Sequence, residues 1–352
     1  MPALGSCLGL WGKLSKDLDA WVELWKYDFW VNLDKWIGKA NFDLQKIDNA
    51  EEFVKYRFGS EGLHFFDRTT GLNILFDEIR NTCNPQSLAP KFVAFAITNA
   101  CDLACSYCYA DKRPDNLQFE KIMGWLQDLD ALGSFGVGFG GGEPTLYPQF
   151  EQLCKEVFSR TKLSISFTTH GHHLTPQFFY ALQDSVHFVR ISMDGVASTY
   201  EELRGRSFDK FLEKLRLLSE NVPFGINVVI NEKTVLELDR IYQVASDFGA
   251  RELLFLPQRA NLTHDAATCK TMQTLGEWIA RYKGHISLLT NQVINGVETI
   301  CWQNQFPDQE YAFISARGIL KRTSYSENGI DLSDFTLPEA FIALQRLEAI
   351  NG

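Results

Sequence analysis

The chain has 352 residues, of which 45% are hydrophobic and 22% charged, a composition typical of a globular protein rather than a disordered one. Its formal net charge of -10 argues against a partner that is a nucleic acid or an anionic membrane. We find no apolar run of about 18 residues and no basic N-terminal segment leading into an apolar stretch, so we predict a cytoplasmic protein without a transmembrane helix or secretory signal.

The N-terminal segment, residues 1–90, contains five of the eight Trp residues and is predicted to be mainly helical. A short strand pair, Leu63–Asp67 and Asn73–Phe76, follows these helices and is joined by a turn. The Trp side chains would form either a platform for a peptide partner or a lid that packs on the main domain, and we favour the lid.

A repeated pattern of strand, loop and helix then runs through residues 91–258. Six predicted strands are Phe92–Thr98, Gly136–Gly140, Ser164–Thr169, Val186–Ser192, Phe224–Ile230 and Glu252–Leu256. Five predicted helices are Leu117–Leu132, Tyr147–Phe158, Pro176–Leu182, Phe208–Ser219 and Thr234–Phe248. This α/β pattern predicts a partial (β/α)6 TIM-like barrel, because six units are fewer than a closed barrel needs, with its site at the carboxyl ends of the strands. Residues 259–352 are predicted to be a small α+β extension with a helix at Thr271–Tyr282, a hairpin at Tyr311–Tyr325 and a helix at Pro338–Ile350.

Three of the eight cysteines, Cys101, Cys105 and Cys108, follow the first barrel strand in the spacing C-x3-C-x2-C. A loop with this spacing can place three thiolates around one cubic iron–sulfur cluster, and the missing fourth cysteine leaves one iron open to a ligand. A zinc site completed by Asp102 or a distant His is one alternative, and a disulfide with one free thiol is another.

The cysteine loop, with the aromatic Tyr107 before its last Cys, resembles the signature of the radical S-adenosylmethionine (SAM) superfamily. The second strand ends Gly140-Gly141-Gly142-Glu143-Pro144, which is similar to the G-G-E-P motif of that superfamily. The resemblance implies a [4Fe–4S] cluster on the three cysteines, and SAM bound by its fourth iron and by this second motif. It also implies reductive cleavage of SAM to a 5′-deoxyadenosyl radical. A Gly-rich turn without ligand remains the alternative for the second motif.

Further positions resemble those that contact SAM in the superfamily. They are Thr169, Ser192, Asp194, Arg204, which would meet the SAM carboxylate, and Asn231. His170, His172 and His173 are interpreted as a polar rim of the site, with a mononuclear metal site as the alternative.

The order of motifs across residues 92–257 resembles enzymes that modify ribosomally made peptides. Too few cysteines follow Cys108 for the extra clusters of SPASM-type maturases, so the chain resembles a single-cluster maturase. The Nif11-class maturase and splicease group is the nearest resemblance. The expected reaction on a precursor peptide is epimerisation, crosslinking or tyramine-excision splicing. An external flavodoxin or ferredoxin would supply electrons, and an accessory peptide-recognition protein is considered as a further partner.

Two other functions stay open: a radical SAM enzyme acting on a small molecule, and a non-catalytic iron–sulfur or zinc module. If the reaction is epimerisation, a thiol must return hydrogen to the substrate, and Cys301 is the preferred donor over Cys154 and Cys269. Each of these cysteines has the alternative of a buried, small apolar residue.

Overall fold

The computed structural model describes residues 54–59, 62–69, 71, 73–76, 89–182, 184–261, 264–291, 300–301 and 311–351. The Trp-rich helices predicted in the N-terminal segment lie outside the described residues. Their role as lid or peptide-binding segment therefore stays a prediction. All described residues belong to one compact unit, Glu52–Gly352.

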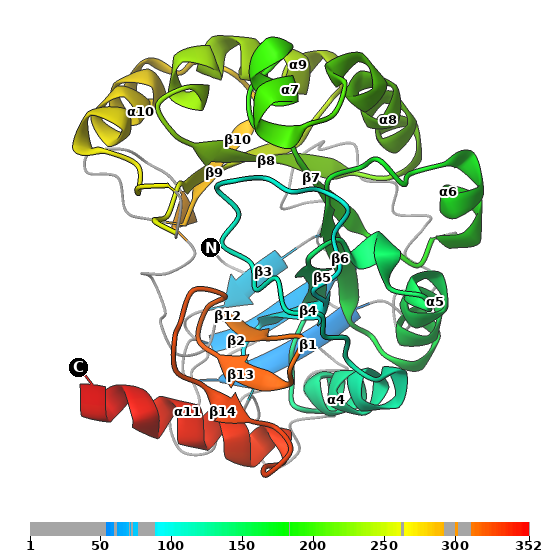
Figure 1. Ribbon diagram of the computed structural model, residues 1–352. Coiled ribbons are helices and arrows are strands. Elements are labelled where there is room, and N and C mark those ends of the chain that lie inside the picture. The colour runs from blue at the N-terminus through cyan, green and yellow to red at the C-terminus, as the bar shows by residue number, and fades with distance from the viewer. Residues whose placement is uncertain are drawn as a thin grey trace, which may run out of the picture. The chain divides into compact units, whose positions relative to one another are not determined.

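The main sheet has the strand order β11-β10-β9-β8-β7-β6-β5-β4-β12-β13-β14 (Figure 1). Its strands are β4 (Phe92–Thr98), β5 (Gly136–Gly141), β6 (Ser164–Thr169), β7 (Phe188–Ser192), β8 (Phe224–Ile230), β9 (Glu252–Pro257), β10 (Ser287–Thr290), β11 (Ile300–Cys301), β12 (Tyr311–Ile314), β13 (Ile319–Lys321) and β14 (Ile330–Asp331). Every pair from β11 through β12 is parallel, and the two pairs β12–β13 and β13–β14 are antiparallel. The six predicted barrel strands and the partial-barrel fold are confirmed.

The helices lie around the outside of the curved sheet (Figure 1). They are α4 (Phe119–Ala131), α5 (Phe150–Arg160), α6 (Pro176–Leu182), α7 (Ser198–Arg204), α8 (Phe208–Asn221), α9 (Leu238–Asp247), α10 (Cys269–Arg281) and α11 (Leu337–Asn351), with short 3-10 turns η2 (Pro144–Leu146) and η3 (Thr234–Glu237). The sequence analysis did not predict the seven-residue helix α7.

The two faces of the sheet differ in side-chain size along β5 and β6. The outer residues Phe139, Phe167 and Ile191 are at most 1% exposed and pack under the helices. The inner positions alternate with them, and Gly138 pairs with Ser166 in register. Burial along β6 alternates in the same way, because its inner positions are partly exposed. Small and polar inner residues leave space that large apolar residues would have filled.

The C-terminal residues extend the same sheet at both of its edges. β10 and β11 continue it beyond β9, and β12 pairs in parallel with β4. The predicted hairpin is confirmed in its pairing, since β12 and β13 are antiparallel neighbours. The predicted helices near residues 271 and 338 are α10 and α11. The division of the chain at residues 90 and 258 stays a prediction.

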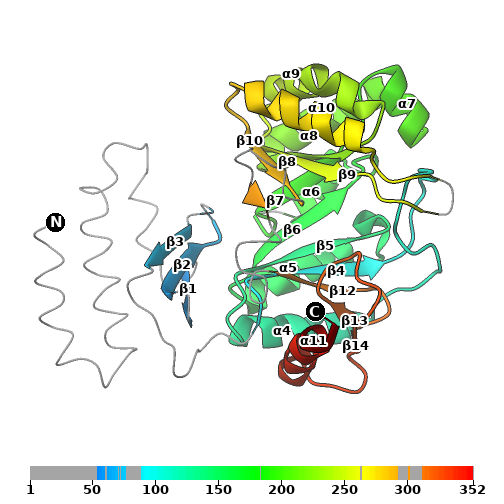
Figure 2. The same cartoon turned by 90° about the vertical axis from the view of Figure 1, so that its left-hand side faces the viewer.

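A second sheet contains β1 (Val54–Gly59), β2 (Gly62–Asp67) and β3 (Asn73–Phe76), all antiparallel (Figure 2). The predicted pairing of β2 with β3 is confirmed, and β1 was missed because the sequence analysis treated its residues as part of a helical segment. Arg57 donates to Ala89 O at 2.6 Å, and Arg68 donates to Thr161 O at 2.7 Å. Both carbonyls precede barrel strands, so the small sheet contacts the amino ends of the strands, opposite the predicted site.

Candidate active site

The three motif cysteines lie on the loop that follows β4. All three are free thiols and partly exposed. The backbone N–H of Cys108 donates to Cys105 O at 3.1 Å, and this turn brings the second and third cysteines together. The predicted alternative of a disulfide with one free thiol is not what the structure contains.

The glycine motif at the end of β5 packs directly on the backbone that leads into this loop. Gly142 N–H donates to Thr98 O at 2.8 Å, and Glu143 N–H donates to Ala100 O at 2.7 Å. A Cβ on Gly141 would lie 2.0 Å from Thr98 O, and Gly141 also has a φ of +122° that disfavours any side chain. The glycines are therefore needed for contact between two chain segments, a reason that the motif alone did not reveal.

The Glu143 carboxylate is 1% exposed and is surrounded by protein donors. Its Oε1 accepts from the Thr145 and Thr169 hydroxyls, each at 2.7 Å, and its Oε2 accepts from His170 N–H at 2.9 Å. These bonds join the end of β5 to the end of β6. Thr169 is thus placed beside Glu143, as part of the same cluster and 2% exposed.

A second buried acid, Asp194, holds the cysteine loop from the other side. It is fully buried, and its Oδ2 lies 2.5 Å from both the Tyr107 hydroxyl and Arg204 Nη2. Its Oδ1 accepts from Val229 N–H at 2.6 Å. Burial and the Asp194 charge raise the pKa of Tyr107, so its hydroxyl stays protonated and donates. Asp194 therefore acts through Tyr107 and Arg204 and is not itself exposed to a ligand.

Arg204 lies beside one of the motif thiols. Its Nη1 lies 3.9 Å from Cys105 Sγ, and its guanidinium carbon lies 5.9 Å from the Tyr107 ring centroid. Its Nε is buried and has no hydrogen-bond partner in the protein. A guanidinium in this position leaves one donor for a further group.

The remaining two predicted contacts lie at the ends of neighbouring strands. Ser192 ends β7 and is partly exposed, in register with Asn227 of β8. Asn231 follows β8 and is 8% exposed, and its Oδ1 accepts from the backbone N–H groups of Lys233 and Thr234 at 3.0 Å. Because Asn231 already caps the turn η3, only its amide side remains for other contacts, and that amide donates to Gln258 Oε1 at 3.2 Å.

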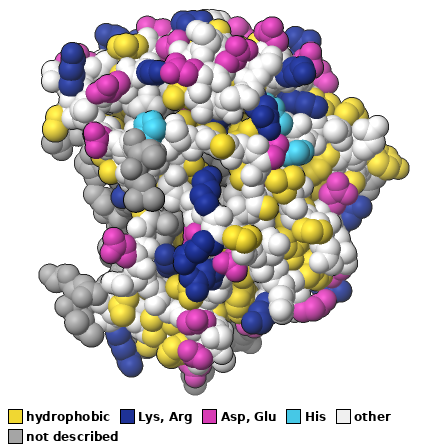
Figure 3. All heavy atoms as spheres, viewed as in Figure 1, with side chains coloured by type: hydrophobic (Ala, Val, Ile, Leu, Met, Phe, Trp, Pro, Cys, Tyr) yellow, Lys and Arg dark blue, Asp and Glu magenta, His cyan; other side chains and the backbone are white. Residues whose placement is uncertain are grey.

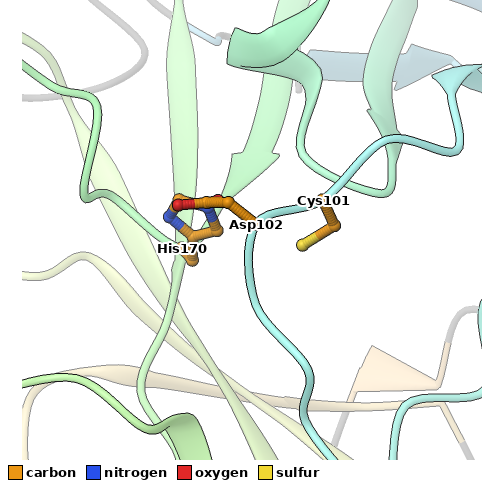
Figure 4. Close-up of side chains that lie close together, drawn as sticks. All are labelled: Cys101, Asp102 and His170. Atoms are coloured by element: carbon orange, nitrogen blue, oxygen red, sulfur yellow. The ribbon is translucent and has the colours of Figure 1, made fainter.

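The sequence analysis considered Asp102 only as a zinc ligand and the histidines as a polar rim, and the structure brings Asp102 and His170 together. Asp102 and His170 lie side by side (Figure 4), with Asp102 Oδ1 2.8 Å from His170 Nε2. Arg206 Nη2 lies 3.2 Å from Asp102 Oδ2. His170 Nδ1 accepts from His172 N–H at 3.1 Å, so its Nε2 carries the proton and donates to Asp102. Although burial raises the pKa of Asp102, His170 and His173 outweigh it and hold that pKa well below its usual range. The sequence signal that could have indicated this contact was a carboxylate directly after a motif Cys, together with polar residues at the end of another barrel strand.

Sulfur and oxygen near this cluster offer an alternative metal site. The ligand atoms of Cys101, Asp102 and His170 lie within 4.8 Å of one another. Asp102 already accepts the His170 proton, however, and a structural zinc site takes four ligands. The geometry therefore favours a hydrogen-bonded support for the cysteine loop.

Two of the cysteines considered as hydrogen donors have contrasting surroundings, and the third is described only in its backbone. Cys154 in α5 is fully buried, and burial raises the pKa of its thiol. Cys269 begins α10 and is exposed. Cys301 lies in β11, where its backbone pairs with Thr290 of β10, and its role stays a prediction.

The donor set fits a cluster with one open metal position. Three free thiols lie on one loop, an arginine is within 3.9 Å of one of them, and two glycines bring backbone against that loop. The arginine Nε that has no partner in the protein is a donor that an anionic ligand would satisfy.

Comparison with family models matches residues 95–245 to the Radical SAM superfamily. The chain is 32% identical over 170 residues to "Mycofactocin maturase MftC" of Mycobacterium tuberculosis, covering 46% of this chain and 43% of that protein. It is 30% identical over 171 residues to "Sporulation killing factor maturation protein SkfB" of Bacillus subtilis, covering 47% of this chain and 42% of that protein. The match thus spans less than half the length of these relatives.

Solved structures share the fold over more of the chain. Streptococcus suis SuiB bound to precursor peptide SuiA has a TM-score of 0.65 at 12% identity, covering 82% of this chain and 87% of that one. The structure of anSMEcpe with bound AdoMet and Cp18Cys peptide has a TM-score of 0.56 at 17% identity, covering 71% and 79%. Among the described residues, we find no helix that is both long and apolar enough to cross a membrane.

Proposed function

Because residues 95–245 form a radical SAM domain, we propose that this protein cleaves SAM reductively and uses the radical to modify a ribosomally made precursor peptide. The observation that carries this proposal is the cysteine loop itself, held by the Gly141–Glu143 motif on one side and by the Asp194–Arg204 pair on the other.

The cofactors of a radical SAM domain are a [4Fe–4S] cluster and SAM, and together they supply a 5′-deoxyadenosyl radical that abstracts hydrogen from a substrate. In this chain Cys101, Cys105 and Cys108 would hold the cluster. Backbone at Gly141 and Gly142, the side chain of Ser192 and the Arg204 Nε, which has no partner in the protein, would contact SAM.

The surrounding residues hold the loop in place before any ligand binds. Asp194 orients Tyr107 and Arg204, and Asp102 accepts hydrogen bonds from His170 and Arg206. Such preorganisation removes the cost of ordering the loop when the reaction begins.

A peptide substrate is supported by the relatives named as maturases and by the likeness to a fold whose structure was solved with a precursor peptide. Electrons would come from an external flavodoxin or ferredoxin. An accessory protein that recognises the peptide is proposed as a further partner, and the cytoplasm as the location.

The test is an anaerobic assay for 5′-deoxyadenosine after reconstitution with iron and sulfide, in the presence of SAM and a strong reductant. We expect turnover by the wild type and none by Cys105→Ala, whose iron content should also fall. Cys269→Ala is the matched control, because Cys269 is exposed on α10 and is expected to leave iron and turnover unchanged. A fully loaded wild type that never cleaves SAM would contradict the proposal and favour a non-catalytic iron–sulfur module. If SAM is cleaved but no precursor peptide is altered, the small-molecule alternative gains support.

A further inference from the structure

A cluster of two tyrosines and one arginine lies beside the cysteine loop, on residues that the proposed chemistry does not use. Arg259 comes two residues after the carboxyl end of β9, Tyr325 lies in the loop after β13, and Tyr109 directly follows Cys108. The Arg259 guanidinium carbon is 3.8 Å from the Tyr325 ring centroid. The Tyr325 and Tyr109 ring centroids are 4.5 Å apart, and the Tyr109 hydroxyl lies 3.2 Å from Ser324 Oγ.

This cluster is tied to the loop that carries the motif thiols. Asn261, two residues after Arg259, donates from its amide to Ser106 O at 2.8 Å. Tyr109 is itself part of this loop, because it directly follows Cys108. Arg259 therefore lies at the carboxyl end of the barrel strands. It belongs to the same group of side chains as Tyr109, which directly follows the predicted cluster ligand Cys108.

Arg259 differs from Arg190 and Arg204 in having no acidic partner among the described residues. Arg190 pairs with Glu252 at 2.6 Å and Arg204 with Asp194 at 2.5 Å. Within the described part of the chain, no carboxylate forms an ion pair with Arg259, and its Nε is buried without a hydrogen-bond partner. This is so although the chain has 44 acidic residues. A partly buried guanidinium without a counter-ion is costly in a free protein, and an anionic ligand would offset that cost.

The chemistry of the cluster indicates the ligand. Stacking on Tyr325 fixes the plane of the guanidinium, and a fixed planar guanidinium suits a carboxylate, which it binds through two parallel hydrogen bonds. Tyr109 is 50% exposed and offers an aromatic surface next to it. In Figure 3, Lys and Arg side chains gather near the middle of the face shown.

We propose that Arg259, held by Tyr325 and flanked by Tyr109, forms a subsite that binds a carboxylate of the peptide substrate, on an Asp or Glu side chain or at the peptide C-terminus. This inference rests on the proposed function, since it names a feature of the peptide. The methionine carboxylate of SAM has the same chemistry, and the experiment must separate the two sources.

Equilibrium dialysis of the reconstituted full chain with SAM provides the test, and it needs no turnover. The probes are pools of hexapeptides, acetylated and amidated at their ends, with either Glu or Gln fixed at the third position and no other acidic residue. A further Gln pool with a free C-terminus tests the terminal carboxylate. The proteins are the wild type, Arg259→Gln, Arg259→Lys and the control Arg251→Gln. Arg251 is exposed at the amino end of the same strand, so the control makes the same change in net charge away from the site.

We expect the wild type and Arg251→Gln to prefer a carboxylate pool by about 10-fold, as a charge-assisted pair implies. Arg259→Gln should lose this preference, and Arg259→Lys should keep part of it. Equal binding of all pools by the wild type overturns the proposal, as does an unchanged preference in Arg259→Gln. Arg259 is assigned to SAM instead if Arg259→Gln keeps the peptide preference but needs about 10-fold more SAM for half-maximal 5′-deoxyadenosine formation. If Arg259→Gln does not fold, the carboxylate preferences of the wild type and of Arg259→Lys still test the proposal. A wild type that makes no 5′-deoxyadenosine refutes the proposed function, whereas the dialysis judges the subsite separately.

Discussion

Replacing Gly142 by Ala tests whether the glycine motif is needed for backbone contact. The new Cβ would lie 2.1 Å from Ala100 O and 2.6 Å from Asn99 O. Carbon–oxygen contacts in proteins are about 3.3 Å or longer, so the two segments must separate by about 1 Å. The neighbouring hydrogen bonds from Gly142 N–H to Thr98 O at 2.8 Å and from Glu143 N–H to Ala100 O at 2.7 Å would then be lost.

The expected cost follows from these contacts. Two net backbone hydrogen bonds contribute about 1 kcal/mol each, and overpacking adds about 1 to 3 kcal/mol, so we expect the free energy of unfolding to fall by about 3 to 5 kcal/mol. The cysteine loop should also be displaced, and less iron should bind per chain. Urea unfolding of the iron-free protein measures the first effect, and iron analysis after reconstitution measures the second.

Gly140→Ala is the matched control within the same motif. A Cβ on Gly140 would meet nothing within 4 Å. Its stability should therefore be unchanged, or higher by up to about 1 kcal/mol because the unfolded chain loses freedom. If Gly142→Ala unfolds at the same urea concentration as Gly140→Ala and binds equal iron, the argument from close backbone contact is refuted.

Three further perturbations test the other supports of the site and barrel. Arg204→Gln leaves the fully buried Asp194 carboxylate without its counter-ion, so urea unfolding should show a loss of about 3 kcal/mol, and a loss below about 1 kcal/mol would contradict the pairing. Phe167→Ala, at a position 1% exposed under the helices, should cost about 3 to 5 kcal/mol, whereas Tyr180→Ala, at 77% exposure, should cost little in the same assay. His187 has a pKa lowered to about 4 by burial and then by Arg68, and its Nδ1 accepts from Ile165 N–H at 3.0 Å. The unfolded state therefore binds more protons between its own pKa near 6.5 and about 4, so His187 contributes stability that is present above this window and lost as the pH falls through it. His187→Gln should flatten that part of a curve of unfolding free energy against pH, and an unchanged slope would refute the assignment.

Much of the barrel could be predicted because its signal is local. The strands Phe92–Thr98, Ser164–Thr169 and Phe224–Ile230 were predicted with the same bounds as β4, β6 and β8. Each is a short apolar or alternating run between turn residues, and such runs depend little on distant parts of the chain. The strands β10 and β11 were not predicted, since they are short and gain their partners only by adding to the edge of β9.

The candidate site was predictable in its membership but not in its contacts. Glu143 and Asp194 were predicted to contact SAM, which stays a prediction, and the structure adds protein donors around both carboxylates that the sequence did not reveal. Asp102 was considered only as a zinc ligand, yet it joins the cysteine loop to His170 and Arg206. Residue type and spacing do not reveal which donor reaches which acceptor.

The sequence by itself determined the cysteine spacing, the order of the motifs and the alternation of strands and helices, because these are properties of neighbouring residues. Tertiary structure alone decided that Arg259 stacks on Tyr325, 66 positions later in the chain, and that Arg204 lies beside Cys105, 99 positions earlier. Such pairs form only when the sheet curves and brings the loops at the ends of its strands together. Long-range partners of this kind leave no periodic trace in the sequence, and their electrostatic consequences follow from burial that only the folded chain creates.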